Sequence, residues 1–154
     1  MRVLRFAVLV AALALATTAA QAQNPFGYGR KKEEAPKGPA PKQEKQFPFG
    51  ASWTLVSLNG KTFSGERPSF ILDQQYRIKG FGGCNTFSAT AYALREQRFA
   101  VGPLALTKKA CDKGVMASEQ AFFVALRTAA LWDLAGPNLV IKGQNGELKL
   151  ERSL

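Results

Sequence analysis

Residues 77–92 read RIKGFGGCNTFSATAY, and this stretch decides the fold. The residues at both of its ends favour β-strands, and Gly80, Gly82 and Gly83 interrupt them. Glycine adopts backbone angles that other residues avoid, so the three glycines indicate a sharp turn with a close approach of the backbone. Cys84, one of only two cysteines in the chain, follows this turn directly.

The start of the chain has the pattern of a secretory signal peptide. Two arginines precede an unbroken apolar run at residues 6–16, and a small-x-small cleavage pattern follows at residues 20–22. The apolar run is shorter than the roughly 20 residues that span a bilayer. We therefore expect removal of residues 1–22 by cleavage near Ala22 and a periplasmic or secreted location. A retained N-terminal anchor is the alternative.

Residues 23–50 differ in composition from the rest of the chain. They contain five of the eight prolines, and six basic residues against three acidic ones. Almost nothing between Tyr28 and Phe47 is apolar, so no buried surface offsets the entropy that ordering the segment would cost. We expect a disordered Pro/Lys-rich tether. Its net positive charge predicts weak, salt-sensitive contact with an anionic envelope surface.

Residues 51–154 have the length of one small domain. Thirteen basic and eight acidic residues are scattered through this domain rather than clustered. A nucleic-acid-binding protein would carry a basic stripe with interleaved aromatic residues. The charge pattern and the expected export both argue against nucleic acid as a partner.

Short strands separated by turn signals dominate the domain. Strands are predicted at residues 52–58, 69–73, 75–79, 86–94, 97–101, 104–107, 131–134, 138–142 and 147–152. Residues 112–130 instead carry apolar side chains at helical spacing, with Asp112 as the N-cap. Gly114 weakens the first turn and favours a regular helix from Val115. The pattern predicts an antiparallel α+β domain in which a curved sheet wraps one helix.

Several motifs occur in a characteristic order along this domain. They are Trp53-x-Leu55, Gly60, Arg77-x-x-Gly80, Gly83-Cys84-Asn85-x-Phe87, Tyr92, Leu106-Thr107-x-x-Ala110-Cys111, Met116-x-x-Glu119-x-x-Phe122, Leu139-Val140-Ile141 and Gly146-Glu147-Leu148-Lys149-Leu150. This ordered set resembles the META domain of HslJ-like envelope proteins, and the resemblance covers essentially all of residues 51–154. One departure is Ala89, where a glycine is expected in the family.

The resemblance implies a fold and a broad biological setting. The implied fold is a single α+β domain with a strongly curved antiparallel sheet, a half-open barrel, around one main helix. The implied setting is an exported protein linked to heat shock, antibiotic tolerance and envelope stress. No catalytic activity is established for the family. The resemblance therefore implies a non-enzymatic stress-tolerance or binding module, with an unknown envelope protein as its partner.

The chain contains no histidine, which limits its chemistry. Ser-His-Asp and Cys-His catalytic arrangements are excluded within the chain, and two cysteines alone cannot complete a structural zinc site. Asp112, Glu119 and Asp133 are conceivable as paired carboxylates, but nothing in their spacing brings them together. We expect no enzymatic activity, no metal and no cofactor.

The two cysteines, Cys84 and Cys111, favour a disulfide because the chain is expected to be exported and their number is even. The Cα atoms of a bridged pair should lie within about 4.4–6.8 Å. In the alternative, Cys111 is a redox-active thiolate at the helix start beside Lys108 and Lys109. The lack of a Cys-x-x-Cys pattern favours the structural bridge.

Glu119 lies within or at the edge of the apolar stripe of the predicted helix, between Val115 and Phe122. A buried carboxylate must be paired or protonated. Two interpretations remain open. Glu119 either reaches solvent or a nearby basic side chain, or it accepts hydrogen bonds from the backbone of the turn at residues 83–86.

Aromatic residues are numerous for so small a domain. They include Phe70, Tyr76, Phe81, Phe87, Phe99, Phe122, Phe123 and Trp132. The simpler interpretation is a packed core. In the other interpretation, the sheet fails to close over the helix and leaves a cleft for an acyl chain or a segment of a partner. The alternative function is accordingly a carrier of a lipid or other hydrophobic ligand in the half-open barrel.

Overall fold

The computed structural model describes residues 44–63 and 65–153. The expected signal peptide and residues 23–43 of the expected tether lie outside the described residues. Within the described part of the chain, no helix is long and apolar enough to cross a membrane.

The strands and the helix follow the predicted order. They are β1 Ser52–Leu58, β2 Ser69–Leu72, β3 Arg77–Phe81, β4 Thr86–Ala93, β5 Phe99–Val101, β6 Ala105–Leu106, α1 Lys113–Arg127, β7 Ala129–Ala135, β8 Asn138–Gly143 and β9 Gly146–Arg152. A 3-10 turn, Arg95–Gln97, separates β4 from β5.

Strand β3 begins at Arg77, later in the sequence than predicted, because a turn follows β2. The Asp73 carboxylate accepts hydrogen bonds of 2.9 Å from the backbone N–H groups of Gln75 and Arg77. Tyr76 adopts a positive φ of 61° in this turn. The side chain of Asp73 therefore holds a tight turn where the strand was predicted to begin.

The helix starts at Lys113, directly after the predicted N-cap Asp112 and without the delay to Val115 that Gly114 suggested, and it ends at Arg127, earlier than predicted. The Thr128 N–H donates to the Val124 carbonyl oxygen over 3.1 Å, and the Thr128 hydroxyl donates to the same oxygen over 2.8 Å. Ala129 already belongs to β7. Ala129 and Ala130, the last apolar residues of the helical pattern, therefore belong to strand β7 and not to the helix.

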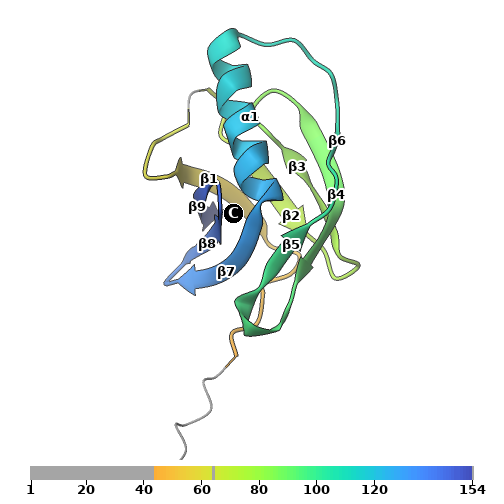
Figure 1. The fold of residues 1–154 in the computed structure, drawn as a ribbon, viewed down its shortest axis with the longest axis vertical. Coiled ribbons are helices and arrows are strands. Elements are labelled where there is room, and N and C mark those ends of the chain that lie inside the picture. The colour runs from red at the N-terminus through yellow and green to blue at the C-terminus, as the bar shows by residue number, and fades with distance from the viewer. Residues whose placement is uncertain (1–43, 64, 154) are drawn as a thin grey trace, which may run out of the picture. The chain divides into compact units, whose positions relative to one another are not determined.

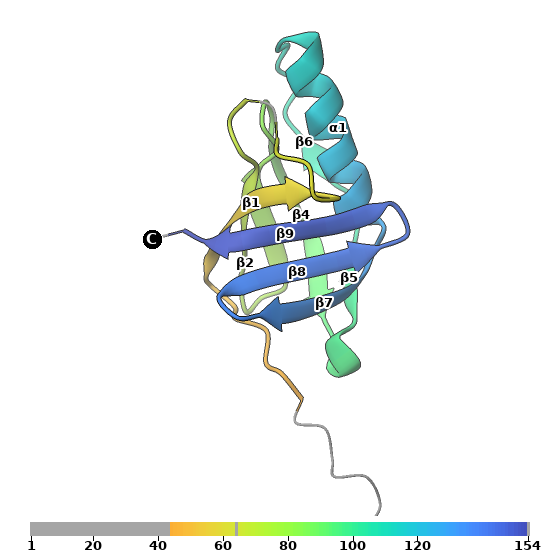
Figure 2. The same cartoon turned by 90° about the vertical axis from the view of Figure 1, so that its left-hand side faces the viewer.

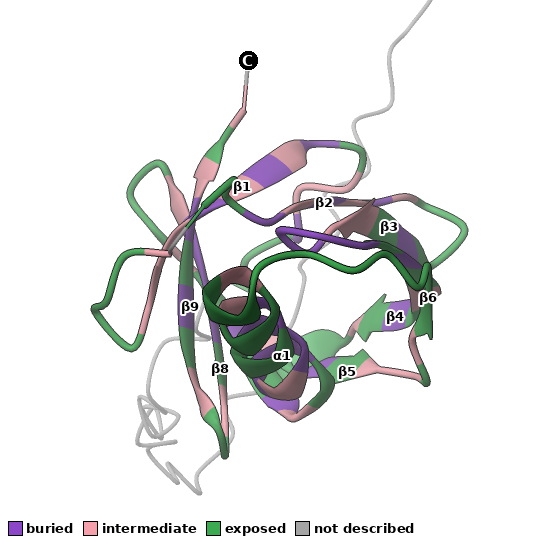
Figure 3. Cartoon of the chain, turned by 90° about the horizontal axis from the view of Figure 1, so that it is seen from above, coloured by how far each residue is buried: buried purple, intermediate pink, exposed green. Residues whose placement is uncertain are grey.

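The strands pair antiparallel and form one strongly curved sheet. Their order is β5-β4-β3-β2-β1-β9-β8-β7, and β6 pairs with β4 beside this path. A bridge between Arg98 and Leu131 joins the chain next to β5 to β7, so the sheet curls into a nearly closed barrel (Figure 2). The sheet surrounds α1 when the domain is seen from above (Figure 3). The predicted α+β domain with a curved antiparallel sheet around one main helix is confirmed.

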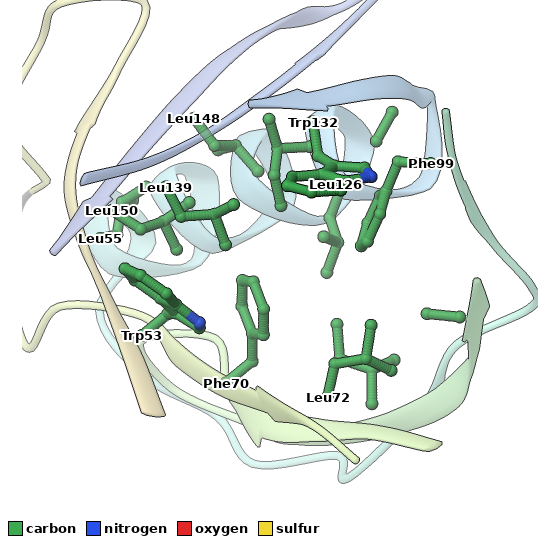
Figure 4. Close-up of a cluster of buried hydrophobic side chains, with 14 of the residues drawn as sticks. Trp53, Leu55, Phe70, Leu72, Phe99, Leu126, Trp132, Leu139, Leu148 and Leu150 are labelled. Carbon is green, nitrogen blue, oxygen red and sulfur yellow. The ribbon is translucent and has the colours of Figure 1, made fainter. Parts of the chain in front are cut away.

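Side chains from the sheet and from one face of α1 fill the interior. Figure 4 shows side chains of both halves of the sheet and of the helix meeting in one cluster. The fully buried members include Leu55, Phe70, Leu72, Ile78, Phe122, Leu126, Leu139, Ile141, Leu148 and Leu150. Burying a side chain of this size stabilises the fold by about 1.5–3 kcal/mol. Most of the predicted aromatic residues thus belong to the core, whereas Tyr76 is exposed.

Residues 44–50, which the sequence analysis assigned to the tether, are described and lead into the barrel. Phe47 is only 7% exposed, and its ring centroid lies 5.9 Å from that of Phe99 and 5.1 Å from that of Trp132. The Gly50 N–H also donates to the Leu72 carbonyl oxygen over 2.8 Å, so both packing and backbone pairing hold this segment. The folded domain therefore begins before Ala51.

Candidate functional site

Glu119 is buried on α1 and binds the glycine turn between β3 and β4. Its Oε1 accepts hydrogen bonds from the backbone N–H groups of Cys84, at 3.1 Å, and Asn85, at 2.6 Å. Its Oε2 accepts a hydrogen bond of 2.8 Å from Nδ2 of Asn85. The structure supports the second interpretation from the sequence, in which Glu119 pins the turn to the helix.

The side chain of Asn85 extends this network to the linker between β6 and α1. Its Oδ1 accepts hydrogen bonds from the Thr107 hydroxyl, at 2.9 Å, and from the Lys109 backbone N–H, at 2.8 Å. Asn85 is itself buried. The buried network therefore joins three segments that are distant in sequence: the glycine turn, the linker and the helix.

A disulfide between Cys84 and Cys111 joins the glycine turn to the same linker. The two Cα atoms lie 6.1 Å apart, within the range expected from the sequence. Cys84 is buried, whereas Cys111 is exposed just before the start of α1. The disulfide and the hydrogen bonds of Asn85 thus both connect the glycine turn to the linker between β6 and α1.

The glycines of this turn allow its backbone to approach the helix. A Cβ atom on Gly82 would lie 2.7 Å from Oε1 of Glu119 and 2.3 Å from Cζ of Phe123. Gly83 has a φ of +115°, which side chains other than glycine rarely adopt. A Cβ on Gly80 would collide with the backbone of the neighbouring strand β2. These contacts explain the run of glycines that the sequence places here.

The remaining motif residues divide between the core and the surface. Trp53, Phe87 and Phe122 are buried in the core. Tyr92 and Met116 are each 43% exposed. Most of the motif thus contributes packing and hydrogen bonds, and the structure does not gather its exposed members with the buried network.

The three carboxylates considered in the sequence analysis lie on separate elements. Asp112 precedes α1, Glu119 lies in its middle, and Asp133 lies on β7. Lys45 Nζ lies 2.5 Å from Oδ1 of Asp133, and this hydrogen bond lowers the pKa of Asp133 below its usual value. Among the described residues, no group of three or more His, Cys, Asp or Glu side chains is placed to hold a metal ion.

A groove of about 470 Å³ lies between α1 and the segment that contains β5 and β6. It is lined by Val101, Gly102, Pro103, Leu104, Leu106, Gln120, Phe123, Val124 and Arg127. The four helical members of this lining are spaced i, i+3, i+4 and i+7, so they form one stripe along α1. The volume lies within the range of about 300–1,000 Å³ that is typical of ligand sites.

Strand β6 forms one wall of this groove and lies at the edge of the sheet (Figure 1). Leu106 pairs with Phe87 of β4. One residue further on, the Thr107 N–H donates to the Thr86 carbonyl oxygen over 3.1 Å, which makes Thr107 and Thr86 a hydrogen-bonded pair. Such pairs alternate with non-hydrogen-bonded pairs in an antiparallel ladder. The backbone N–H and C=O of Leu106 therefore point away from β4.

The sequence left open a cleft where the sheet fails to close over the helix, and this groove lies between those two elements, but the pattern did not indicate which residues line it. The available signal was the stripe of Gln120, Phe123, Val124 and Arg127 on the predicted helix. This stripe lies next to the core-facing stripe, and a sequence pattern alone does not show which part the sheet leaves uncovered.

Comparisons with known proteins agree with the fold. A protein from Burkholderia xenovorans with an NMR structure is 22% identical, with a TM-score of 0.52, and the similarity covers 77% of this chain and 99% of that chain. Another protein with an NMR structure is also 22% identical, with a TM-score of 0.55 and coverage of 66% of this chain and 87% of that chain. At these identities the likeness shows the fold alone. No curated protein matches the chain.

The family model of the META domain matches residues 45–153. The match begins before Phe47, which agrees with the packing of that residue inside the barrel. It also includes the glycine turn, both cysteines and the helix that carries Glu119. The chain belongs to the META domain family.

Proposed function

We propose that the chain is an exported, non-catalytic binding protein of the cell envelope, and that the groove between α1 and β6 is its binding site. The observation that carries this proposal is the groove itself, because apolar side chains such as Leu106 remain accessible in it together with polar groups, beside a barrel interior that side chains fill. A binding role is also compatible with the link to envelope stress that the family resemblance implies.

Two features of the chain support a non-catalytic role. It contains no histidine, the most frequent general acid and base in enzymes. Its buried carboxylate, Glu119, already accepts three hydrogen bonds from the glycine turn. A carboxylate that is buried and held in this way contributes to structure and is not accessible to a substrate.

Export is supported by the signal-peptide pattern and by the disulfide. Disulfides persist in oxidising compartments such as the bacterial periplasm and are rare in reducing ones. The pair Cys84–Cys111 links two segments that the fold needs to keep together. In such a compartment the bridge would keep the glycine turn attached to the linker between β6 and α1.

The groove can be tested with anilinonaphthalenesulfonate, a probe that combines apolar rings with an anionic group. We expect saturable NMR shifts of the Leu106 and Val124 amides. The substitution Val124→Glu should weaken binding at least about tenfold, equivalent to about 1.4 kcal/mol. Leu131→Glu is the control, because Leu131 is an exposed apolar residue that lies on β7 and does not line the groove. Shifts confined to other surfaces, or equal losses in both variants, would contradict the proposal.

A carrier of an anionic single-chain lipid is the second candidate. Arg127 on the rim would pair with a carboxylate, and Leu104, Leu106 and Val124 would contact the chain. Native mass spectrometry of protein purified from the envelope would distinguish a lipid carrier from a protein that binds a partner. A lipid adduct that disappears in Arg127→Glu would favour the carrier, whereas protein without an adduct would favour a binding site for a partner.

A further inference from the structure

We infer that the groove receives an extended, acidic segment of a partner protein, which adds to β6 as another strand of the sheet. The inference rests on the proposed function, because it names the occupant of the same groove. It is carried by the backbone geometry of β6, by the side chains that line the groove and by the net positive charge of the chain segment that supplies this lining.

The free edge of β6 provides the backbone contacts. The N–H and C=O of Leu106 point away from β4, as the pairing of Thr107 with Thr86 requires. An extended peptide that adds to an exposed edge satisfies such groups with its own backbone. Pro103 has no N–H, so the edge that a peptide can use begins after it. A bound segment should therefore lie beside residues 104–108.

The walls of the groove suit a strand with alternating side chains. Leu106 is 44% exposed, and Leu104 and Val124 are half-buried, while Phe123 forms a buried floor. Every second side chain of an extended segment points to the same side. Apolar residues at alternate positions of the segment would therefore face α1, and the residues between them would face solvent.

Residues 98–127, the part of the chain that supplies the groove lining, are predominantly basic. Within residues 98–127 the exposed charged residues are Arg98, Lys108, Lys109, Lys113 and Arg127 against a single exposed carboxylate, Asp112. The other acid of this range, Glu119, is buried and hydrogen-bonded to the glycine turn. None of the five basic side chains forms an ion pair with a described carboxylate. Charge complementarity therefore favours a partner segment with acidic residues.

The backbone of β6 favours a peptide over an acyl chain. A peptide offers a donor and an acceptor at each residue, and both can pair with the outward-facing groups of Leu106. An acyl chain has neither along its length, so it would cover these groups without replacing the hydrogen bonds that they make to water. Burying an unpaired backbone group is unfavourable.

The test uses random nonapeptides displayed on phage and selected against the protein. We expect the selected peptides to alternate apolar and polar positions, to be enriched in aspartate and glutamate, and to bind more weakly as salt is raised. At saturation, hydrogen exchange of the Leu106 amide should slow at least about tenfold, because this N–H becomes hydrogen-bonded. Selected peptides that leave Leu106 exchange unchanged would overturn the inference.

Two variants separate this inference from the proposed function. Leu106→Pro removes the outward-facing N–H and should abolish peptide binding, and anilinonaphthalenesulfonate is titrated in parallel against the unaltered protein. Leu106→Ala keeps the N–H and should retain the slowed exchange in the complex. If the dye binds in the groove but the peptides bind elsewhere, the inference fails and the proposed function stands. If neither the dye nor the peptides bind in the groove, the inference and the proposed function both fail. Should Leu106→Pro fail to fold, exchange in the unaltered protein decides the question.

Discussion

Three N–H groups donate to the Glu119 carboxylate, two from the backbone and one from the side chain of Asn85. In Glu119→Gln an amide NH2 would face Nδ2 of Asn85, so two donors would meet. Asn85 cannot turn its amide round without cost, because its Oδ1 already accepts from Thr107 and Lys109. A single atom change therefore disturbs the whole network.

We expect Glu119→Gln to lower the free energy of unfolding by about 1–3 kcal/mol, the usual cost of leaving a buried polar group without a partner. Urea denaturation followed by circular dichroism measures this change. The control is Gln120→Ala on the exposed side of the same helical turn, which should change stability by less than about 0.5 kcal/mol. Equal stability of Glu119→Gln and the unaltered protein would show that the network does not hold the turn.

Replacing either of two glycines, Gly82 or Gly114, by alanine should change the stability of the fold in opposite directions. Gly82→Ala would place a Cβ 2.3 Å from Cζ of Phe123 and should destabilise the fold by about 1–3 kcal/mol. Gly114 on α1 has open space around the corresponding position. Gly114→Ala should therefore stabilise by up to about 1 kcal/mol. Thermal denaturation of the two variants should move the midpoint in opposite directions, and shifts of the same sign would refute the packing argument.

At the scale of elements, the disulfide ties the glycine turn to the linker before α1. A bridge across a sequence separation of 27 residues is worth about 3–4 kcal/mol in the chain-entropy model. Changing Cys84 and Cys111 together to serine should therefore lower stability by about 2–4 kcal/mol and leave the fold intact, because the Glu119 network joins the same segments. Denaturant titration with and without reductant measures the loss.

Free-thiol titration decides between the two interpretations of the cysteines. We expect no reactive thiol in protein exported to the periplasm and purified without reductant. Two reactive thiols per chain would contradict the structural bridge and restore the redox interpretation, with the exposed Cys111 as the attacking sulfur.

The segment that contains Phe47 is a second attachment between elements. Phe47→Ala removes a ring that contacts both Phe99 and Trp132, and we expect a loss of about 3–5 kcal/mol. Lys45→Ala is the control, since its exposed ion pair with Asp133 should contribute less than about 1 kcal/mol. A similar small effect of both changes, measured by urea denaturation, would show that residues before Ala51 do not belong to the folded domain.

The Lys45–Asp133 pair also gives this attachment a small pH dependence. Folding lowers the pKa of Asp133 from its usual value of 3.8, mainly through the hydrogen bond from Lys45. The contribution of the pair is therefore fully present above pH 3.8 and is lost as the pH falls through the lower pKa of the folded state.

At the scale of the whole molecule, the sequence predicted most of the elements because each one buries a single face. The alternation along β1 and β4 and the helical spacing of α1 reflect which residues enter the core. Glu119 attracted attention for the same reason, as a carboxylate in an apolar stripe. Its partner depended on the placement of the glycine turn against the helix, which local sequence does not specify.

The packing of Phe47 and the lining of the groove could not be predicted from local sequence. Phe47 lies among prolines and charged residues, and its local composition does not reveal that Phe99 and Trp132, far along the chain, form a pocket for its ring. The groove arises because β6 is short and leaves one stripe of α1 uncovered. Both features depend on contacts between segments that are distant in sequence.

We propose that the buried Glu119 network maintains the fold, whereas the groove between α1 and β6 binds the partner. The most direct test is the dissociation constant of anilinonaphthalenesulfonate, measured by NMR titration for Glu119→Gln and Val124→Glu under conditions in which both are folded. We expect unchanged binding in Glu119→Gln and binding at least about tenfold weaker in Val124→Glu. Loss of binding in a stable Glu119→Gln variant, with binding retained in Val124→Glu, would contradict it.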